Sequence, residues 1–215
     1  MKNKLVLLGA GGHCKAVIDV LLQMNKYSIE GILDLKENIA KKVLNIPVVG
    51  TDSTLNLLLK KGIRHCFITV GSTGDPKKRI VLYKLLKRMN FNFINVISPS
   101  AIISQQTKIG HGNFIAPGAI INASTIIGNN CIINTGSIVD HDCDIADNVH
   151  IAPGSTLSAG IKIGHNTHVG TGSSIIQYLT IGKNVLIGAG SVVTKNVPDN
   201  VLAYGNPCRV IKSNE

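Results

Sequence analysis

The sequence lacks the features that mark membrane-spanning, secreted and metal-binding proteins. No apolar run approaches the roughly 18 residues of a membrane span, and a glycine-rich stretch follows the N-terminal apolar run too soon for a signal peptide. The five cysteines show no close pair with metal-ligand spacing, so we interpret them as reduced packing residues. We therefore expect a cytoplasmic protein with no membrane span.

Aromatic and acidic residues are scarce. Aromatic residues make up 4% of the chain and none is interleaved with basic residues, which argues against a nucleic-acid partner. Residues 1–100 hold 16 Lys plus Arg against 6 Asp plus Glu, whereas residues 101–215 hold 6 of each. The entire net charge of +10 thus lies in the first half. This favours an anionic partner there, although a solvated basic surface fits the count equally well.

What the sequence does contain is a six-residue repeat. Every sixth residue from Ile103 to Val193 is Ile, Val or Leu, without exception. Most residues two positions earlier are small or apolar, and because strand side chains alternate, both sets point to the same side. Each hexad is then a short strand and a corner, and only stacked coils of such strands bury the apolar side. The sequence predicts a solenoid with a period too short for helical repeats.

Residues at intervals of 18 distinguish three corners of each coil. Glycine recurs at one corner and asparagine at the second, and both tolerate positive φ, so these corners are interpreted as scaffolding. The third corner follows no rule, and a break in a strict pattern favours function. The three columns are Gly118, Gly136, Gly154, Gly172 and Gly190; Asn130, Asn148, Asn166 and Asn184; and Ser124, Asp142, Gly160 and Tyr178.

His141 and Asp142 lie at this irregular corner. A histidine held by a carboxylate can remove the proton from an acceptor amine or hydroxyl as it attacks a thioester. Such a reaction needs neither a metal nor a protein nucleophile, because the thioester is already activated. The pair is therefore a candidate general base for acyl transfer.

The first hundred residues predict alternating strands and helices. Residues 4–8 form an apolar run, followed by the turn 9–13 and a helical pattern, an arrangement that aims backbone N–H groups at an anion such as phosphate. A dinucleotide fingerprint would have glycine at Cys14, so the match to an NAD site is incomplete. A strand over residues 29–33 ends at Asp34, whose carboxylate either binds a nucleotide or caps the strand.

Later segments complete a small parallel sheet. Strands are expected over 46–50 and 65–70, a helix from about residue 52 to 61, and another helix that begins at Asp75 and Pro76. Ligands of parallel sheets bind beyond the carboxyl ends of the strands. Residues 199–210 are interpreted as an irregular tail. The candidate binding residues at the sheet edge are Gly11, Gly12, His13, Asp34 and Gly71.

The Gly-x-Gly-Gly-His opening, the hexapeptide solenoid, the segment 134–143 and the ending Gly205-Asn206-Pro207 together resemble a family of sugar acetyltransferases. This family includes UDP-4-amino-sugar N-acetyltransferases of bacillosamine biosynthesis and sialic acid O-acetyltransferases. The resemblance implies an α/β plus all-β chain. A small Rossmann-like parallel-sheet domain over 1–97 would bind the nucleotide sugar, and a left-handed parallel β-helix of hexapeptide repeats over 98–215 would bind acetyl-CoA.

The resemblance also implies the reaction and the residues. Acetyl would pass from acetyl-CoA to the 4-amino group of a UDP-linked amino-deoxy sugar, or alternatively to a hydroxyl of a sialic-acid-like sugar. His141 matches the general base and Asp142 its carboxylate partner, for which the family often has Glu. The remaining matches are Asn134 for the acceptor sugar, Gly11, Gly12, His13, Asp34 and Gly71 for the nucleotide sugar, and His150, Thr171 and Ala189 for acetyl-CoA.

Two other classes of function are disfavoured. Some solenoids of this type are zinc-dependent carbonic anhydrases, and His150 and His168 are predicted to stack one coil apart. The histidine spacing of such sites is absent, however, so no metal is expected. A non-catalytic nucleotide-sugar-binding protein would leave His141 without a role.

Side chains that point outward from the predicted strands differ among the three faces. The second and third faces are too apolar for water and favour a partner. A prism that buries two faces closes as a homotrimer, with His141 of one chain facing the acetyl-CoA residues of the next. The outward residues are Ile126, Asp144, Lys162 and Thr180 on the first face; Ile120, Ile138, Thr156, Ser174 and Val192 on the second; and Phe114, Ile132, His150, His168 and Leu186 on the third.

Overall fold

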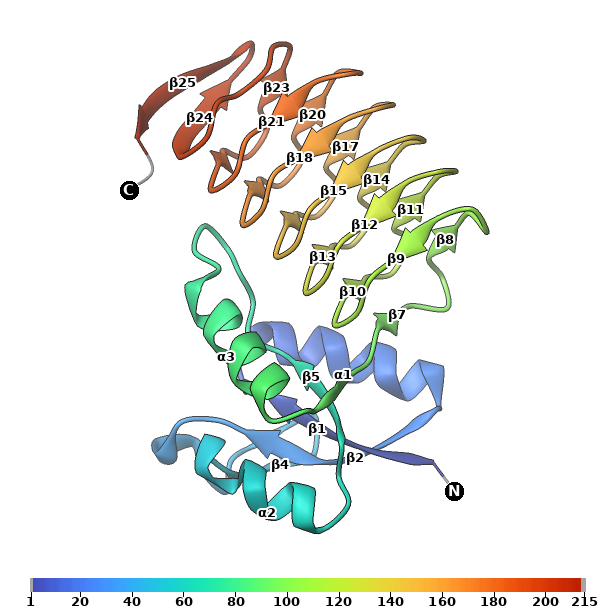
Figure 1. Cartoon of the computed structure of the whole chain (residues 1–215), viewed down its shortest axis with the longest axis vertical. Coiled ribbons are helices and arrows are strands. Elements are labelled where there is room, and N and C mark those ends of the chain that lie inside the picture. Colours follow the sequence, from blue (N-terminus) through green and yellow to red (C-terminus); the bar gives the residue numbers. More distant parts are fainter. Residues whose placement is uncertain (1, 214–215) are drawn as a thin grey trace. The chain divides into compact units, whose positions relative to one another are not determined.

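The computed structural model describes residues 2–213, and the chain divides into two compact units, Met1–Pro99 and Ser100–Glu215. The first unit is an α/β sheet with helices on both faces, and the second is a stack of short strands (Figure 1).

The sheet of the first unit has the strand order β3-β4-β2-β1-β5-β6. Neighbouring strands are parallel except β3 and β4, so the sheet is mixed at one edge. The strands are β1 (Asn3–Leu8), β2 (Tyr27–Leu33), β3 (Lys42–Val43), β4 (Ile46–Gly50), β5 (His65–Ile68) and β6 (Asn92–Phe93), and β7 (Val96–Ile97) follows. The helices are α1 (Gly12–Met24), α2 (Leu55–Lys60) and α3 (Lys77–Arg88), with short 3-10 helices η1 (Lys36–Asn38) and η2 (Asp52–Thr54).

Alternation along the strands supplies an apolar layer on each face of this sheet. Val6 and Leu8 of β1 pack in one cluster with residues of α2 and α3, including Leu55 and Leu86. Leu7 lies between them in the sequence and is also fully buried. Helix α1 buries Val17, Ile18, Val20 and Leu21, an amphipathic pattern of helical period.

Several element ends differ from the sequence-based expectation. The strand expected over 65–70 ends at Ile68, where Thr69 turns its hydroxyl onto the carbonyl of Gly9 at 2.5 Å. The helix expected over 52–61 is divided into η2 and α2. The prediction of an irregular tail was wrong, because β24 (Val201–Gly205) and β25 (Cys208–Ser213) form an antiparallel hairpin. Leu202 extends the pairing of the last coil, and the hairpin therefore covers its end.

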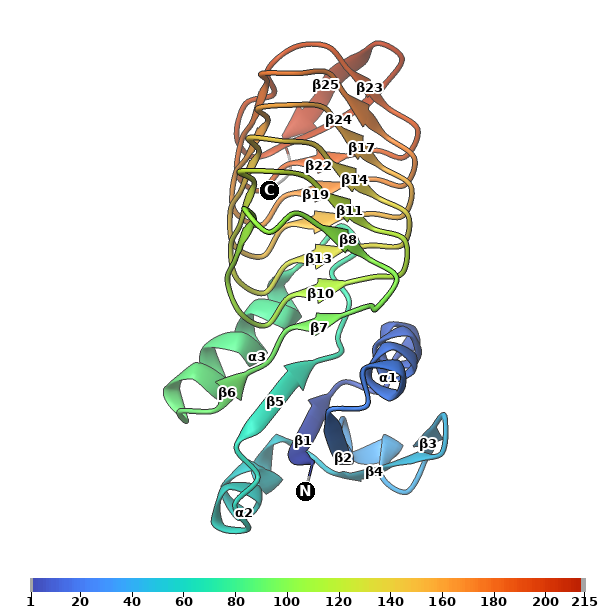
Figure 2. The ribbon, with the colours of Figure 1, turned by 90° about the vertical axis from the view of Figure 1, so that its right-hand side faces the viewer.

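The second unit is a left-handed parallel β-helix, in which strands of successive coils pair with an offset of 18 residues, as in Ile120 with Ile138 (Figure 2). The first face has β9 (Lys108–Ile109), β12 (Ile126–Ile127), β15 (Asp144–Ile145), β18 (Lys162–Ile163) and β21 (Thr180–Ile181). The second has β8 (Ile102–Ile103), β11 (Ile120–Ile121), β14 (Ile138–Val139), β17 (Thr156–Leu157), β20 (Ser174–Ile175) and β23 (Val192–Val193). The third has β10 (Phe114–Ile115), β13 (Ile132–Ile133), β16 (His150–Ile151), β19 (His168–Val169), β22 (Leu186–Ile187) and β24.

All three corners share one backbone conformation. The glycine column has φ between 64° and 70°, and the asparagine column has φ between 54° and 63°. Ser124, Asp142, Gly160 and Tyr178 have φ of 60°, 59°, 67° and 59°. The third corner is therefore irregular only in its side chains, and its backbone follows the same scaffold as the other two. The asparagine side chains of successive coils form a ladder of hydrogen bonds, such as the bond from Asn148 Nδ2 to Asn166 Oδ1 at 3.0 Å.

The three faces differ in how much of them the single chain covers. On the third face, Phe114, Ile132, His150 and His168 are all buried. The second face keeps apolar surface, since Ile102 is 65% exposed. The first face is exposed and mostly polar, as expected.

Candidate active site

His141 follows β14 at the corner between the second and first faces, and its imidazole is paired with the next residue. The Nδ1 atom of His141 lies 2.7 Å from Oδ2 of Asp142. A carboxylate only accepts hydrogen bonds, so Nδ1 carries the proton and Nε2 of the neutral ring is the basic nitrogen. The left-handed backbone of Asp142 turns its carboxylate back onto the ring.

A second carboxylate fixes the backbone of the same corner. Asp140 Oδ1 accepts hydrogen bonds from Asn122 Nδ2 at 2.7 Å and from the His141 amide at 2.8 Å, which lowers the pKa of Asp140. The hydrogen bond that His141 donates to Asp142, followed by the negative charge of Asp140, raises the pKa of His141 above its ordinary value. The corner thus presents an imidazole of increased basicity.

A hollow of about 560 Å³ adjoins His141. The side chain of His141 is 51% exposed, so a substrate can reach it. The lining residues are Ser104, Asn122, Ala123, Ser124, Asp140, His141 and Asp142. Ser104 and Asn122 were missed by the sequence analysis, and only the offset of 18 residues between Asn122 and Asp140 points to them.

The residues matched to the acceptor sugar and to acetyl-CoA lie at another part of the β-helix. Asn134 Nδ2 lies 3.1 Å from His150 Nε2. The His150 and His168 rings are perpendicular, with centroids 4.6 Å apart. Thr171 and Ala189 are exposed on the glycine corner, one coil apart. None of these residues lines the hollow at His141, so a single chain does not bring the two groups together.

In the first unit, Asp34 binds the backbone of the glycine turn. Its carboxylate accepts hydrogen bonds from the Ala10 amide, from the Leu35 amide at 2.6 Å and from Asn38 Nδ2 at 3.0 Å. Partial burial raises the pKa of Asp34, but these hydrogen bonds outweigh it and the pKa is lowered. Asp34 therefore caps the strand, which was one of the two alternatives, and also lines a pocket described below.

The N-terminus of α1 is open. A Cβ atom added at Gly11 or Gly12 would meet nothing within 4 Å, so these glycines leave room for a ligand above the helix N-terminus. His13 lies within 3.7 Å of the position of a Cβ on Gly71. Burial, and then the charge of Arg79, lowers the pKa of His13 to about 3, so the imidazole is neutral at physiological pH. The structure thus brings His13 and Gly71 together.

Arg79 was also missed by the sequence analysis. It is buried on α3 and donates to the carbonyls of Ile68 and Val70 at 2.6 and 2.9 Å. These bonds hold the chain where β5 ends. A basic residue in a lysine-rich helix gave no sign that it would be buried.

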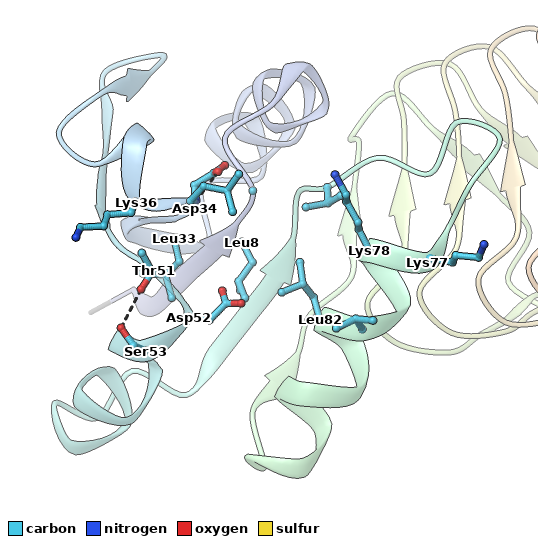
Figure 3. A pocket seen from close by; sticks show the side chains of 14 residues that line it. Leu8, Leu33, Asp34, Lys36, Thr51, Asp52, Ser53, Lys77, Lys78 and Leu82 are labelled. Carbon is cyan, nitrogen blue, oxygen red and sulfur yellow. Dashed lines mark hydrogen bonds between the residues drawn. The ribbon is translucent and has the colours of Figure 1, made fainter.

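A pocket of about 690 Å³ lies at the carboxyl ends of β1, β2, β4 and β5 (Figure 3). It includes Asp34, but Gly11, Gly12, His13 and Gly71 do not line it. Its polar residues Thr51, Asp52 and Ser53 were missed, although they follow β4 as Asp34 follows β2. The lining residues are Leu8, Gly9, Leu33, Asp34, Leu35, Lys36, Thr51, Asp52, Ser53, Val70, Lys77, Lys78, Val81 and Leu82.

Comparison with known proteins supports the same division of the chain. Residues 4–86 match the PglD N-terminal domain family, residues 124–159 match the bacterial transferase hexapeptide (six repeats), and residues 106–141 and 178–201 match the hexapeptide repeat of succinyl-transferase. No curated protein matches the sequence. Perosamine N-acetyltransferase from Caulobacter crescentus is 35% identical, with 98% of both chains covered and a TM-score of 0.92. The chain belongs to the acetyl-CoA-dependent sugar N-acetyltransferases of the hexapeptide-repeat family.

Further relatives of this sugar N-acetyltransferase extend the comparison. The acetyltransferase domain of PglB from Neisseria gonorrhoeae, solved with acetyl coenzyme A, is 31% identical over 98% of this chain and 100% of that one, with a TM-score of 0.90. WeeI from Acinetobacter baumannii is 29% identical over the same shares, with a TM-score of 0.86. The C. crescentus enzyme was solved with CoA and GDP-perosamine, also as its H141N and H141A mutants.

Two absences concern the described part of this sugar N-acetyltransferase. Residues 2–213 contain no group of three or more His, Cys, Asp or Glu side chains arranged to hold a metal ion. No helix within the same residues is long and apolar enough to cross a membrane.

Proposed function

We propose that this enzyme transfers the acetyl group of acetyl-CoA to the amino group of a nucleotide-linked amino-deoxy sugar, with His141 as the general base. The observation that carries the proposal is the 2.7 Å contact between His141 Nδ1 and Asp142 Oδ2 beside an open hollow. In a family of sugar N-acetyltransferases, this pair is the group best suited to remove a proton from an acceptor amine.

The reaction follows from this geometry. The sugar amine attacks the thioester carbonyl while His141 Nε2 takes one of its protons. An N–C bond forms, the C–S bond breaks, and coenzyme A leaves as the thiolate, which the proton then neutralises. Asp142 stabilises the imidazolium that exists between these steps, as expected for a carboxylate hydrogen-bonded to Nδ1. Asp140 holds the backbone on which both groups depend.

The nucleotide end of the substrate is assigned to the first unit. The pocket of about 690 Å³ has apolar walls for a base and basic residues that attract a diphosphate. The phosphates would extend over the open N-terminus at Gly11 and Gly12, with His13 as a neutral hydrogen-bonding contact. The resemblance in the sequence implied UDP as the carrier, whereas the C. crescentus enzyme was solved with a GDP-linked sugar.

The acetyl-CoA residues are assigned to a neighbouring subunit of a homotrimer. His150, Thr171 and Ala189 do not line the hollow at His141 in one chain, so an active site that uses both groups requires a second copy. The exposed apolar residue Ile102 on the second face supports such an interface. In this arrangement Asn134, paired with His150, would meet the acceptor sugar from the partner chain.

Thiol release from acetyl-CoA tests the proposal, with a panel of UDP- and GDP-linked 4-amino sugars and their 4-hydroxy counterparts as acceptors. We expect release with an amino sugar, and the loss of roughly 10²- to 10⁴-fold in turnover for His141→Ala. His165→Asn is the matched control, because His165 is an exposed histidine at a different corner. Normal turnover of a folded His141→Ala protein would exclude His141 as the base, and transfer only to hydroxyl acceptors would establish the O-acetyltransferase alternative.

A further inference from the structure

The pocket of about 690 Å³ in the first unit, which we call the base pocket, contains one carboxylate that accepts no hydrogen bond from the described residues. Both oxygens of Asp34 accept hydrogen bonds from the protein. The hydroxyls of Thr51 and Ser53 bond to each other at 2.8 Å. The carboxylate of Asp52, in contrast, makes no hydrogen bond or ion pair with any of residues 2–213, and Figure 3 shows this side chain beside Leu8 in the pocket. Asp52 is therefore available for a ligand.

The surroundings of Asp52 suit a planar base. Leu8, Leu33 and Val70 come from the ends of strands, and Val81 and Leu82 come from α3, so the pocket has apolar walls on two sides. Partial burial, and then the charge of Asp34, raises the pKa of Asp52. The pocket thus holds two carboxylates, and only that of Asp34 accepts hydrogen bonds from the protein. Such a pocket favours a ligand that brings hydrogen-bond donors rather than acceptors.

We infer that Asp52 recognises the nucleobase and that the base is guanine, an inference that rests on the proposed function. A carboxylate is an acceptor with two oxygens, and it binds best to two adjacent N–H groups. Guanine presents such a pair on its Watson–Crick edge, the ring N1–H and the exocyclic N2–H. Uracil presents a single N3–H between two carbonyl oxygens, so one oxygen of Asp52 would face a carbonyl and be repelled. Adenine and cytosine each present an amine beside an acceptor nitrogen.

The substitution Asp52→Asn makes this inference specific. An amide offers one acceptor and one donor, which no longer matches the N1–H and N2–H pair of guanine but does match the N3–H and carbonyl of uracil. It also matches xanthine, in which a carbonyl replaces the guanine amine. The variant should therefore change preference between bases and not merely weaken binding. Inosine diphosphate, which lacks the exocyclic amine, tests the second hydrogen bond in the unaltered protein.

The experiment is calorimetric titration of the full-length protein with GDP, UDP, inosine diphosphate and xanthosine diphosphate. We expect GDP to bind roughly 10- to 100-fold more tightly than UDP or inosine diphosphate, the discrimination typical of one bidentate pair. Asp52→Asn should reduce GDP affinity by a similar factor and favour xanthosine diphosphate over GDP. Glu37→Gln is the matched control, since it removes a neighbouring acidic charge that does not line the pocket, and it should bind as the unaltered protein.

Two outcomes would overturn the inference: UDP binding as tightly as GDP to the unaltered protein, or an equal loss of affinity for all four diphosphates in Asp52→Asn, which would indicate a structural role. Thiol release separates this inference from the proposed function. Acetyl transfer to a UDP-linked but not a GDP-linked amino sugar would refute only the guanine assignment. Base-specific binding of GDP without acetyl transfer to any amino sugar would refute only the proposed function.

Discussion

Replacing Asp142 by Asn should change the pH dependence of acetyl transfer in a defined direction. The substitution keeps the size of the side chain, and asparagine tolerates the φ of 59° at this position, so the corner should retain its shape. What changes is the partner of His141 Nδ1 in the 2.7 Å contact, because the side chain at position 142 loses its negative charge. The hydrogen bond to Asp142 is the largest cause of the raised pKa of His141.

The sign of the effect follows from the proposed role of His141 as a base. Only the deprotonated imidazole accepts the proton of the amine, so kcat/KM should fall as the pH is lowered through the pKa of His141. Without Asp142 that pKa moves down towards its ordinary value, and the fall in activity should move to lower pH. The plateau above it should also be lower, because the ring is a weaker base and its tautomer is no longer fixed.

The loss of activity in Asp142→Asn should be smaller than the loss in His141→Ala, about 10²- to 10⁴-fold, because the imidazole itself remains. The assay is kcat/KM by thiol release from about pH 5 to about pH 9, a range that brackets the ordinary pKa of histidine. Circular dichroism of the variant checks that the β-helix is intact. An unchanged plateau together with an unchanged pH profile would refute the reasoning that Asp142 acts through His141.

Three further predictions concern the fold and the assembly. Ile151→Ala should reduce the free energy of unfolding in urea by about 2–5 kcal/mol, because this side chain is fully buried, whereas Ile126→Ala on the exposed first face should change it by about 0.5 kcal/mol or less. Gly9→Ala should destabilise the first unit, measured as a lower Tm, because its φ is 111° and the added Cβ would lie 2.9 Å from the Val70 amide; an unchanged Tm would contradict this. Light scattering should give the mass of a trimer, and mixing His141→Ala chains with His150→Ala chains should restore activity; an active monomer would exclude active sites between subunits.

Much of the β-helix could be predicted because one repeated constraint is present at every coil. A side chain every six residues must enter the same core, and residues such as Ile133 and Ile151 are indeed fully buried. The turn at residues 9–13 and the hydrogen bond that the Lys77 amide donates to Asp75 at 2.9 Å, just before α3, also depend only on neighbouring residues, although the N-cap is Pro76 and not Asp75. Local rules were sufficient for these features.

The features that could not be predicted depend on residues that are distant in the sequence. The base pocket joins Asp52 after β4 to Lys77 and Val81 of α3, and no local pattern connects them. The burial of Arg79 depends on two carbonyls of another segment. At the third corner the residue type varies, yet Ser, Asp, Gly and Tyr adopt nearly the same φ, and no local pattern in the sequence indicated this uniform backbone.

The uniform corners give the β-helix a regular spacing along its axis. Because every coil repeats after 18 residues with the same turns, a position along the prism can shift only in steps of one strand spacing, about 4.8 Å. The rows above and below His141 are thus set at discrete heights from its imidazole, and Gly160 and Tyr178 lie one and two steps from Asp142. Adding or deleting one whole coil above His141 would move the residues beyond it by one such step while leaving the corner at His141 unchanged.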